Sequence, residues 1–429
     1  MDRLYVNPSV MCGRIRAPPS KSYTHRAYAL SLLVDGRSII ESPLKSGDTQ
    51  ATLRACKQFG AMVFEENEST TIIGSRLNLP EDVVDAENSG TTLRIFTAIS
   101  TLAPPGYVVL TGDESLRRRP MQPLLDALKH LGVECWSTRG NGCAPIIVKS
   151  GGLKGGETII RGDISSQFIS ALLIASTKAK EETRIKIESD IVSKKYIDAT
   201  IEVLKRYGYT VRRDEYQLFI VEPNQSGRST HFKIPGDFSS ASFILAGAYL
   251  TNGKVEVENL SLELPQADSA IIDILKDFDN KVYINSSKIV VESSGISSGD
   301  REYDLKDSPD LVPVVAVMAS KSIGETIIKG VKHARFKESD RITSTAIELR
   351  KLGVDVEVYE DGMKIRGKEE IEGGVELDPH NDHRLSMAFS ILAASTKRGC
   401  IISGLRWAEI SYPNFLEDLK RLNISFREV

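Results

Sequence analysis

Cysteine is scarce in this chain. The 429 residues include five cysteines, scattered over the whole length, and no two of them form a CxxC pair. An odd and scattered set of this kind supports neither a disulfide framework nor a zinc site. Histidine is also scarce, and neither His380 nor His383 belongs to an HExxH pattern or has an evident third ligand nearby. We therefore expect reduced thiols in or near the core and no bound metal.

Long apolar runs and an excess of one charge are also missing. No apolar run approaches the roughly 20 residues that a membrane-spanning helix requires, and the opening MDRLYVNPSV lacks the apolar segment of a signal peptide. The formal net charge of −3 provides no global basic field that would recruit nucleic acid. We therefore expect a cytoplasmic protein that binds neither membrane nor nucleic acid. If its ligands are anions, the charge that binds them must be local.

What the sequence does contain is an internal repeat. The composition, with 41% hydrophobic and 26% charged residues, is that of a globular protein, and the length suggests two or three domains. Six times, at intervals of about 70 residues, a short polar cluster opens an apolar run of helical length. A helix that is apolar nearly all round is a buried helix. The six runs are Ser20–Val34, Ser89–Leu102, Ser165–Ser176, Ser239–Leu250, Asp310–Ser320 and Asp382–Ala394.

A second, amphipathic helix is expected after each buried one. Several of these end in a large apolar residue followed by Gly, which is a helix C-terminal signal, as in Phe59-Gly60, Leu131-Gly132, Tyr207-Gly208 and Leu352-Gly353. Extended, alternating stretches such as Val354–Tyr359 follow them. Each repeat thus predicts a strand, a buried helix, a strand, an amphipathic helix and a strand hairpin.

Six such units predict an α/β (α+β) fold with two similar domains of three βαβαββ units, in which sheets wall the buried helices. Candidate crossings between the domains are Ala17-Pro18-Pro19 and the polar stretch 223–230. We place the first domain at residues 17–231 and the second at 232–429, with residues 1–16 joined to the second.

The polar clusters lie where helix N-caps belong. A helix N-terminus carries roughly half a positive charge and free N–H groups, so it attracts anions. Capping alone explains most of the Ser and Asp residues, but it does not explain why basic residues gather at the same places. Because guanidinium groups hold phosphate and carboxylate through paired hydrogen bonds, the implied ligands are small polyanions. The basic residues at or near these helix starts are Lys21, Arg26, Arg94, Arg119, Lys337, Arg341 and Arg384.

Some of these clusters have a plainer interpretation when taken singly. The segment Lys337–Arg341 suits a solvated capping sequence, and the basic run Arg117–Arg119 suits a solvated surface before a Pro-initiated helix. Gly90, at the turn into a helix, would let backbone approach a ligand closely, but one Gly is a weak signal. It is the six helix starts together that indicate an anion-binding site.

Five motifs in this order resemble those of the enolpyruvyl transferases, and among them the enzymes that act on shikimate 3-phosphate. They are PPSKSYTHR (Pro18–Arg26), NSGTTLR (Asn88–Arg94), DISSQF (Asp163–Phe168), KESDR (Lys337–Arg341) and NDHR (Asn381–Arg384). The resemblance implies a fold of two domains, each an inside-out α/β barrel of three βαβαββ units, crossed twice by the chain. It implies transfer of the enolpyruvyl group of phosphoenolpyruvate to the 5-hydroxyl of shikimate 3-phosphate, with release of phosphate, in aromatic amino acid biosynthesis. It also implies no cofactor, a monomer, and glyphosate as a competitor of phosphoenolpyruvate.

The resemblance also implies roles for single residues. The catalytic residues would be Asp310 as acceptor of the 5-hydroxyl proton, and Glu338 with Lys21 for the proton at C3 of phosphoenolpyruvate. Shikimate 3-phosphate would be held by Lys21, Ser22, Arg26, Ser165, Ser166, Gln167, Ser193, Tyr196, Asp310 and Lys337. Phosphoenolpyruvate would be held by Lys21, Gly90, Arg119, Gln167, Arg341 and Arg384.

The chain departs from the family pattern at Ser89, Ile95, Lys195 and His333, and Ile410 stands where a Lys is common. Three alternatives compete with this interpretation. One is the transferase acting on UDP-N-acetylglucosamine, although the loop 112–119 lacks the Cys that most of those carry. An RNA 3′-phosphate cyclase would need a basic RNA-binding surface, and a non-catalytic repeat scaffold would need no converging cations.

Overall fold

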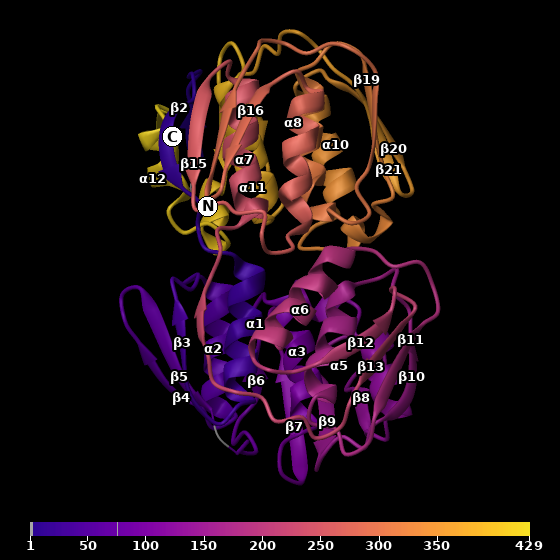
Figure 1. The fold of residues 1–429 in the computed structure, drawn as a ribbon. Helices are drawn as coiled ribbons and strands as arrows, with labels where there is room; N and C mark the ends of the chain where they lie inside the picture. The colour runs from indigo at the N-terminus through magenta and orange to yellow at the C-terminus, as the bar shows by residue number, and fades with distance from the viewer. Residues whose placement is uncertain (1–2, 75) are drawn as a thin grey trace. The chain divides into compact units, whose positions relative to one another are not determined.

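The computed structural model describes residues 3–74 and 76–429. The chain forms two compact units, and each is described by itself. The N-terminal unit is Pro19–Ile234, and the C-terminal unit combines Met1–Pro18 with Pro235–Val429. The chain therefore passes from one unit to the other within Pro18-Pro19 and again within Ile234-Pro235. In both units the helices lie among the sheets, as Figure 1 shows.

In the described residues, each unit has three four-stranded sheets. The sheets of the N-terminal unit, in the order of hydrogen-bonded neighbours, are β14 (His231–Lys233), β3 (Gly36–Glu41), β5 (Ser69–Gly74) and β4 (Met62–Glu65); β6 (Val84–Asp85), β7 (Gly106–Thr111), β9 (Ile146–Ser150) and β8 (Cys135–Ser137); and β10 (Gly156–Ile160), β11 (Thr183–Ile187), β13 (Leu218–Val221) and β12 (Val211–Asp214).

The three sheets of the C-terminal unit follow the same plan. They are β2 (Cys12–Arg16), β15 (Lys254–Glu258), β17 (Lys288–Glu292) and β16 (Lys281–Asn285); β18 (Arg301–Asp304), β19 (Glu325–Lys329), β21 (Gly362–Arg366) and β20 (Asp355–Tyr359); and β22 (Glu376–Leu377), β23 (Cys400–Ser403), β1 (Arg3–Val6) and β24 (Phe426–Glu428).

The six expected apolar runs are all helices with almost every residue buried. Four of them begin directly after the polar residue that opens the run; for example, Ser89 accepts a hydrogen bond from the N–H of Thr92, and Asp382 accepts one from that of Arg384. The other two begin at Phe238, after the cap Asp237, and at Val312. These inner helices are α1 (Lys21–Leu32), α3 (Gly90–Ser100), α5 (Ser166–Ser176), α7 (Phe238–Leu250), α9 (Val312–Ser320) and α11 (His383–Ala394).

The expected amphipathic helices are present too. In four of them the last helical turn is followed by the predicted large residue and a Gly whose φ is positive, between 73° and 102°. A residue other than Gly is strained at such an angle, so the Gly ends the helix. These outer helices are α2 (Gly47–Gln58), α4 (Gln122–His130), α6 (Lys194–Arg206), α8 (Ile271–Asp277), α10 (Arg341–Lys351) and α12 (Phe415–Arg421).

Strand pairing confirms the repeat. In every sheet the first two strands are parallel and the next two pairs are antiparallel, so each sheet is the β-part of one βαβαββ unit. The C-terminal unit repeats this pattern in all three of its sheets. The mixed α/β fold with two similar three-unit halves is therefore the predicted one.

Two strands occupy places that local sequence could not indicate. β2 precedes α1 in the chain but pairs with β15, and β14 precedes α7 but pairs with β3. The two units have thus exchanged the first strands of their first repeats. The N-terminal β1, in turn, completes the last sheet beside β23 and β24. No helix of residues 3–74 and 76–429 is long and apolar enough to cross a membrane.

Candidate active site

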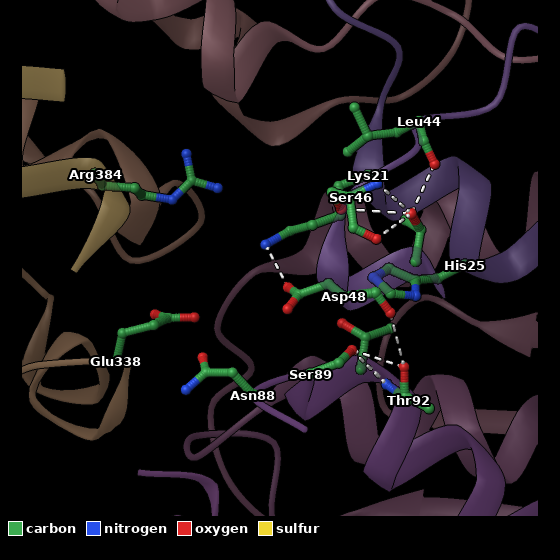
Figure 2. Close-up of polar contacts among 12 residues, drawn as sticks. Lys21, His25, Leu44, Ser46, Asp48, Asn88, Ser89, Thr92, Glu338 and Arg384 are labelled. Atoms are coloured by element: carbon green, nitrogen blue, oxygen red, sulfur yellow. Dashed lines mark hydrogen bonds and ion pairs between the residues drawn. The ribbon is translucent and has the colours of Figure 1, made fainter. Parts of the chain in front are cut away.

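The starts of the inner and outer helices of the N-terminal unit meet around a group of polar side chains. Lys21 begins α1, and its ammonium nitrogen lies 2.9 Å from a carboxylate oxygen of Asp48 in the first turn of α2 (Figure 2). Both side chains are only partly exposed, at 16% and 10%. Asp48 was not predicted from the sequence; the signal that could have found it is the capping box of Ser46 and Thr49 that begins α2.

Two guanidinium groups converge on Gly90, the first residue of α3. Arg94 donates to the Gln167 amide oxygen at 2.5 Å, and the Gln167 amide donates in turn to Thr91 at 3.1 Å. Arg119 donates to the Asn88 amide oxygen at 3.1 Å. A side chain added at Gly90 would place its Cβ 3.3 Å from a nitrogen of each arginine. These contacts join the starts of α3 and α5 with the loop before α4.

The basic run Arg117–Arg119 is not simply a solvated surface, which corrects the plainer expectation. Arg118 is exposed, but Arg119 is buried with 7% of its surface accessible. Pro120 does not initiate the helix either, because α4 begins at Gln122. The short helical turn Leu116–Arg118 before it turns Arg119 towards Asn88, a contact that composition alone does not indicate.

Arg26 is buried, with 2% of its surface accessible, and its guanidinium is bound by neutral groups. It donates to the Thr200 hydroxyl at 2.7 Å, to the Ser22 carbonyl at 2.8 Å and to the Tyr196 carbonyl at 3.0 Å. Burial lowers the pKa of Arg26 to about 10. Arg26 therefore fixes the backbone of two of the residues expected to bind shikimate 3-phosphate.

The remaining expected residues of this unit lie at helix starts. Ser165 caps α5 by accepting a hydrogen bond from the N–H of Gln167 at 3.3 Å, and Ser166 is the first residue of the helix. Ser193 precedes α6 with a φ of +60°, in the left-handed region. A residue other than Gly in this region costs free energy, and such residues concentrate at functional sites.

In the C-terminal unit, Arg341 lies at the centre of a group of carboxylates. Its guanidinium donates to Asp310 at 2.6 Å, to Glu338 at 2.8 Å and to Asp382 at 2.8 Å. Only 1% of the Arg341 side chain is exposed. The segment Lys337–Arg341 therefore does more than cap α10, because its Arg holds three acidic side chains in fixed positions.

Asp310 faces two further cations. Arg384 lies 2.8 Å from its second carboxylate oxygen, and Lys337 lies 3.6 Å from the first. Although burial opposes ionisation, Arg384, Lys337 and Arg341 hold the pKa of Asp310 well below its usual value. Burial also lowers the pKa of the Lys337 ammonium, against the attraction of Asp310. The structure thus places the expected residues of this unit in one cluster of alternating charge.

Asp268 is a buried carboxyl near this cluster that the sequence did not reveal. It is 1% exposed and accepts a hydrogen bond from the Ser239 hydroxyl, near the start of α7. Burial and the neighbouring Asp310 carboxylate raise its pKa to about 6, while Arg384 acts in the opposite direction. The neighbouring carboxyls of Asp268 and Asp310 thus have pKa values shifted in opposite directions.

We expect the Asp268→Asn variant to be more stable than the parent chain above pH 6. A carboxyl whose pKa is raised on folding, here from 3.8 to about 6, destabilises the fold once it is ionised. This penalty is absent below pH 3.8, grows as the pH rises to about 6 and is constant above it. A pKa shift of about two units corresponds to a difference of up to about 3 kcal/mol in the free energy of unfolding between the variant and the parent chain.

The measurement is urea unfolding of both proteins between pH 4 and pH 8, with the difference between the two curves isolating Asp268. Asp273→Asn, at an exposed position of α8, is the control. A difference that is independent of pH, or a less stable variant at pH 7, would contradict the assignment.

No group of three or more His, Cys, Asp or Glu side chains in the described parts of the chain is arranged to hold a metal ion. His380 instead lies 3.1 Å from Glu348. Ile410, at the position where the family often has Lys, ends a short helical turn next to Glu409, which lies 3.6 Å from Arg406.

Comparisons with known proteins place the chain in one family. The family model "EPSP synthase (3-phosphoshikimate 1-carboxyvinyltransferase)" matches residues 7–419. The chain is 47% identical over 424 residues to the 3-phosphoshikimate 1-carboxyvinyltransferase of Korarchaeum cryptofilum, covering 98% of this chain and 99% of the relative. It is 45% identical over 419 residues to that of Methanothermobacter thermautotrophicus, covering 96% and 97%.

A solved structure agrees with the sequence comparisons. The EPSP synthase of Acinetobacter baumannii superimposes with a TM-score of 0.83 at 25% identity, covering 100% of both chains. None of the comparisons favours the UDP-N-acetylglucosamine transferase, the RNA cyclase or the scaffold. With the repeated fold and the two clusters of helix starts, these matches establish that the chain belongs to the EPSP synthase (3-phosphoshikimate 1-carboxyvinyltransferase) family of enolpyruvyl transferases.

Proposed function

We propose that this chain transfers the enolpyruvyl group of phosphoenolpyruvate to the 5-hydroxyl of shikimate 3-phosphate and releases phosphate. The observation that carries the proposal is that the polar residues at the helix starts differ in charge between the two units. The N-terminal unit presents Lys21, Arg94 and Arg119 together with neutral donors, whereas the C-terminal unit sets carboxylates among cations. Anion binding and proton transfer, the two requirements of this reaction, are thus both provided for.

The N-terminal unit supplies groups for both substrates in this proposal. Ser22, Ser165, Ser166, Ser193 and Tyr196 bind shikimate 3-phosphate, with Arg26 holding the backbone of Ser22 and Tyr196 in place. Hydroxyl and amide donors at helix starts suit a phosphate because the helix dipole adds to their attraction.

Phosphoenolpyruvate binds the groups around Gly90, where no side chain stands in front of the nearest nitrogens of Arg94 and Arg119. Gln167 serves both substrates, and its amide is held by Arg94 and Thr91. Lys21 serves both as well, and it assists Glu338 in moving the proton at C3.

The C-terminal unit supplies the acid and base. Glu338, with Lys21, supplies the proton that adds to C3 of phosphoenolpyruvate. This leaves positive charge at C2, which the resulting Glu338 carboxylate and Asp310 stabilise. Asp310 then accepts the proton of the attacking 5-hydroxyl. Phosphate leaves as Glu338 takes a proton back from C3, and Lys337, Arg341 and Arg384 neutralise the departing charge.

The three cations around Asp310 also explain how it could act as a base. A carboxylate with a strongly lowered pKa is a weak proton acceptor. When a phosphate or carboxylate of a substrate binds Lys337 and Arg384, it shares their positive charge, and the pKa of Asp310 rises. Asp310 would therefore become a better base only in the substrate complex.

The test is release of phosphate from phosphoenolpyruvate, measured with shikimate 3-phosphate, with UDP-N-acetylglucosamine and with neither. Release only with shikimate 3-phosphate supports the proposal, and release with the UDP-sugar would replace it by the alternative. Binding of neither substrate would indicate a scaffold. We propose further that the chain works as a monomer in the cytoplasm, which sedimentation and cell fractionation can check.

We expect Gly90→Ala to weaken inhibition by glyphosate more than it weakens binding of phosphoenolpyruvate. Gly90 does not have a positive φ, so Ala fits the backbone and stability should change little. The added methyl would lie 3.3 Å from a nitrogen of Arg94 and of Arg119, and 3.7 Å from Gln167. Glyphosate is the longer ligand, so crowding here should raise its inhibition constant about 10-fold or more.

Inhibition by glyphosate against variable phosphoenolpyruvate measures both affinities. Gly47→Ala is a matched control, because Gly47 also begins a helix of this unit and its added Cβ would meet nothing nearer than 3.9 Å. An equal loss of affinity for both ligands would mean that the added methyl does not discriminate by ligand length. No loss of affinity for either ligand would place Gly90 away from the pocket.

A further inference from the structure

A chain of buried hydroxyl groups lies beneath the Gly90 turn. His25 Nδ1 is 2.6 Å from the Thr52 hydroxyl, which is 2.6 Å from the Thr92 hydroxyl, and Thr92 donates to the Ser89 hydroxyl at 2.7 Å. All four residues are at most 1% exposed. Figure 2 shows His25, Ser89 and Thr92, with Lys21 and Asp48 close by.

The four hydrogen-bonded residues lie directly behind residues of the candidate site. His25 follows Lys21 by one helical turn on α1, and Thr52 follows Asp48 by one turn on α2. Ser89 is the N-cap of α3 and also accepts a hydrogen bond from the N–H of Thr92 at 3.2 Å. The chain therefore joins the first turns of three helices, each of which carries a group of the site.

The Thr92–Ser89 contact sets a direction for these hydrogen bonds, because its geometry has Thr92 as the donor. With its hydrogen directed to Ser89, or to the Asp48 carbonyl at 3.4 Å, Thr92 accepts from Thr52. Thr52 has then used its only hydrogen and must accept from His25. His25 is therefore the tautomer with hydrogen on Nδ1.

Two further observations agree with that tautomer. Nε2 of His25 is buried and has no hydrogen-bond partner in the described part of the chain. In that tautomer Nε2 is a bare acceptor, which costs less than a buried charge. Burial moreover lowers the pKa of His25 to about 3, so the ring stays neutral at physiological pH.

We propose that His25, Thr52, Thr92 and Ser89 form a one-way hydrogen-bond relay that positions the Gly90 turn and the Asp48 partner of Lys21 for phosphoenolpyruvate. These four are positioning residues and do not touch the substrates. Ser89 is a departure from the common family pattern, and the relay gives it a role: its hydroxyl ends the chain and caps α3. The proposal rests on the proposed function only for its kinetic readout.

The kinetic test removes one hydroxyl at a time while keeping side-chain shape. We expect Thr92→Val and Thr52→Val to raise KM for phosphoenolpyruvate about 10-fold, because a displaced binding turn loses aligned contacts. KM for shikimate 3-phosphate should change less than about 3-fold, since Arg26 and Ser165 are held by other hydrogen bonds. Thr92→Ser and Thr52→Ser retain the hydroxyl and should restore KM.

Thr97→Val is the matched control. Thr97 is a buried threonine on the same helix as Thr92, but its hydroxyl donates only to the Leu93 carbonyl of its own helix, at 2.7 Å. An equal rise of KM in Thr97→Val, or no rescue by the serine variants, would overturn the relay as a positioning device.

A spectroscopic test is independent of catalysis. Proton–nitrogen correlation spectra of imidazole-labelled protein, assigned with a His25→Gln variant, should show His25 as a neutral Nδ1–H tautomer that does not titrate between pH 5 and pH 9. An Nε2–H tautomer, or titration within that range, would overturn the relay even if the enzyme is active. If the tautomer is found but phosphate release is not, the relay stands and the proposed function fails.

Discussion

Replacement of Asp310 by Asn is expected to lower turnover by a factor of ~10²–10⁴, the usual cost of losing one general base. The amide cannot accept the proton of the attacking hydroxyl. It also removes a negative charge that faces Arg341, Arg384 and Lys337. Because those three cations would then be less well neutralised, shikimate 3-phosphate should bind at least as tightly as before.

Steady-state phosphate release and calorimetric titration with shikimate 3-phosphate measure the two effects separately. Asp273→Asn, at an exposed position of α8, should leave both unchanged and serves as the control. Near-normal turnover of Asp310→Asn would remove this residue from the mechanism. Loss of binding together with turnover would indicate that the variant has disrupted the cluster instead.

Replacement of Lys21 by Met is the second change with a large expected effect. Lys21 is the cation proposed to contact both substrates, and removing one preorganised charge of this kind typically costs ~10²–10³-fold in rate. The variant also leaves the Asp48 carboxylate, which is 10% exposed, without the ammonium 2.9 Å away. We therefore expect lower stability as well as lower kcat/KM.

A double variant separates these two consequences. Lys21→Met combined with Asp48→Asn also removes the carboxylate that has lost its ammonium neighbour, so stability should recover while activity stays low. Lys45→Met is a control, because Lys45 is an exposed residue of the same unit that donates only to the Glu66 carbonyl in the described structure. Recovery of activity in the double variant would show that Lys21 acts only by neutralising Asp48.

The opposite pKa shifts of Asp268 and Asp310 have a consequence for pH dependence. Since the pKa of Asp310 lies well below 3.8, its ionisation cannot produce a change in activity near pH 6 in the free enzyme. Asp268, with a pKa of about 6, is an acid of this unit that titrates in that range. An acid limb near pH 6 in kcat/KM should therefore move in Asp268→Asn.

Local sequence patterns are sufficient to predict the repeat, the inner and outer helices and the clustering of cations at helix starts. The reason is that an all-round apolar run, a capping residue and a closing Gly each act within a few residues. The five motifs likewise lie within short segments, so they indicate the family without any knowledge of which segments meet in space.

The way in which distant segments combine follows from folding instead. The exchange of β2 and β14, and the completion of the last sheet by β1, depend on pairings between strands far apart in the chain. Asp268 and the His25 relay were not predicted for the same reason. A carboxyl acquires a shifted pKa, and a hydroxyl its partner, from groups that folding brings within about 3 Å, and no local pattern records which groups those are.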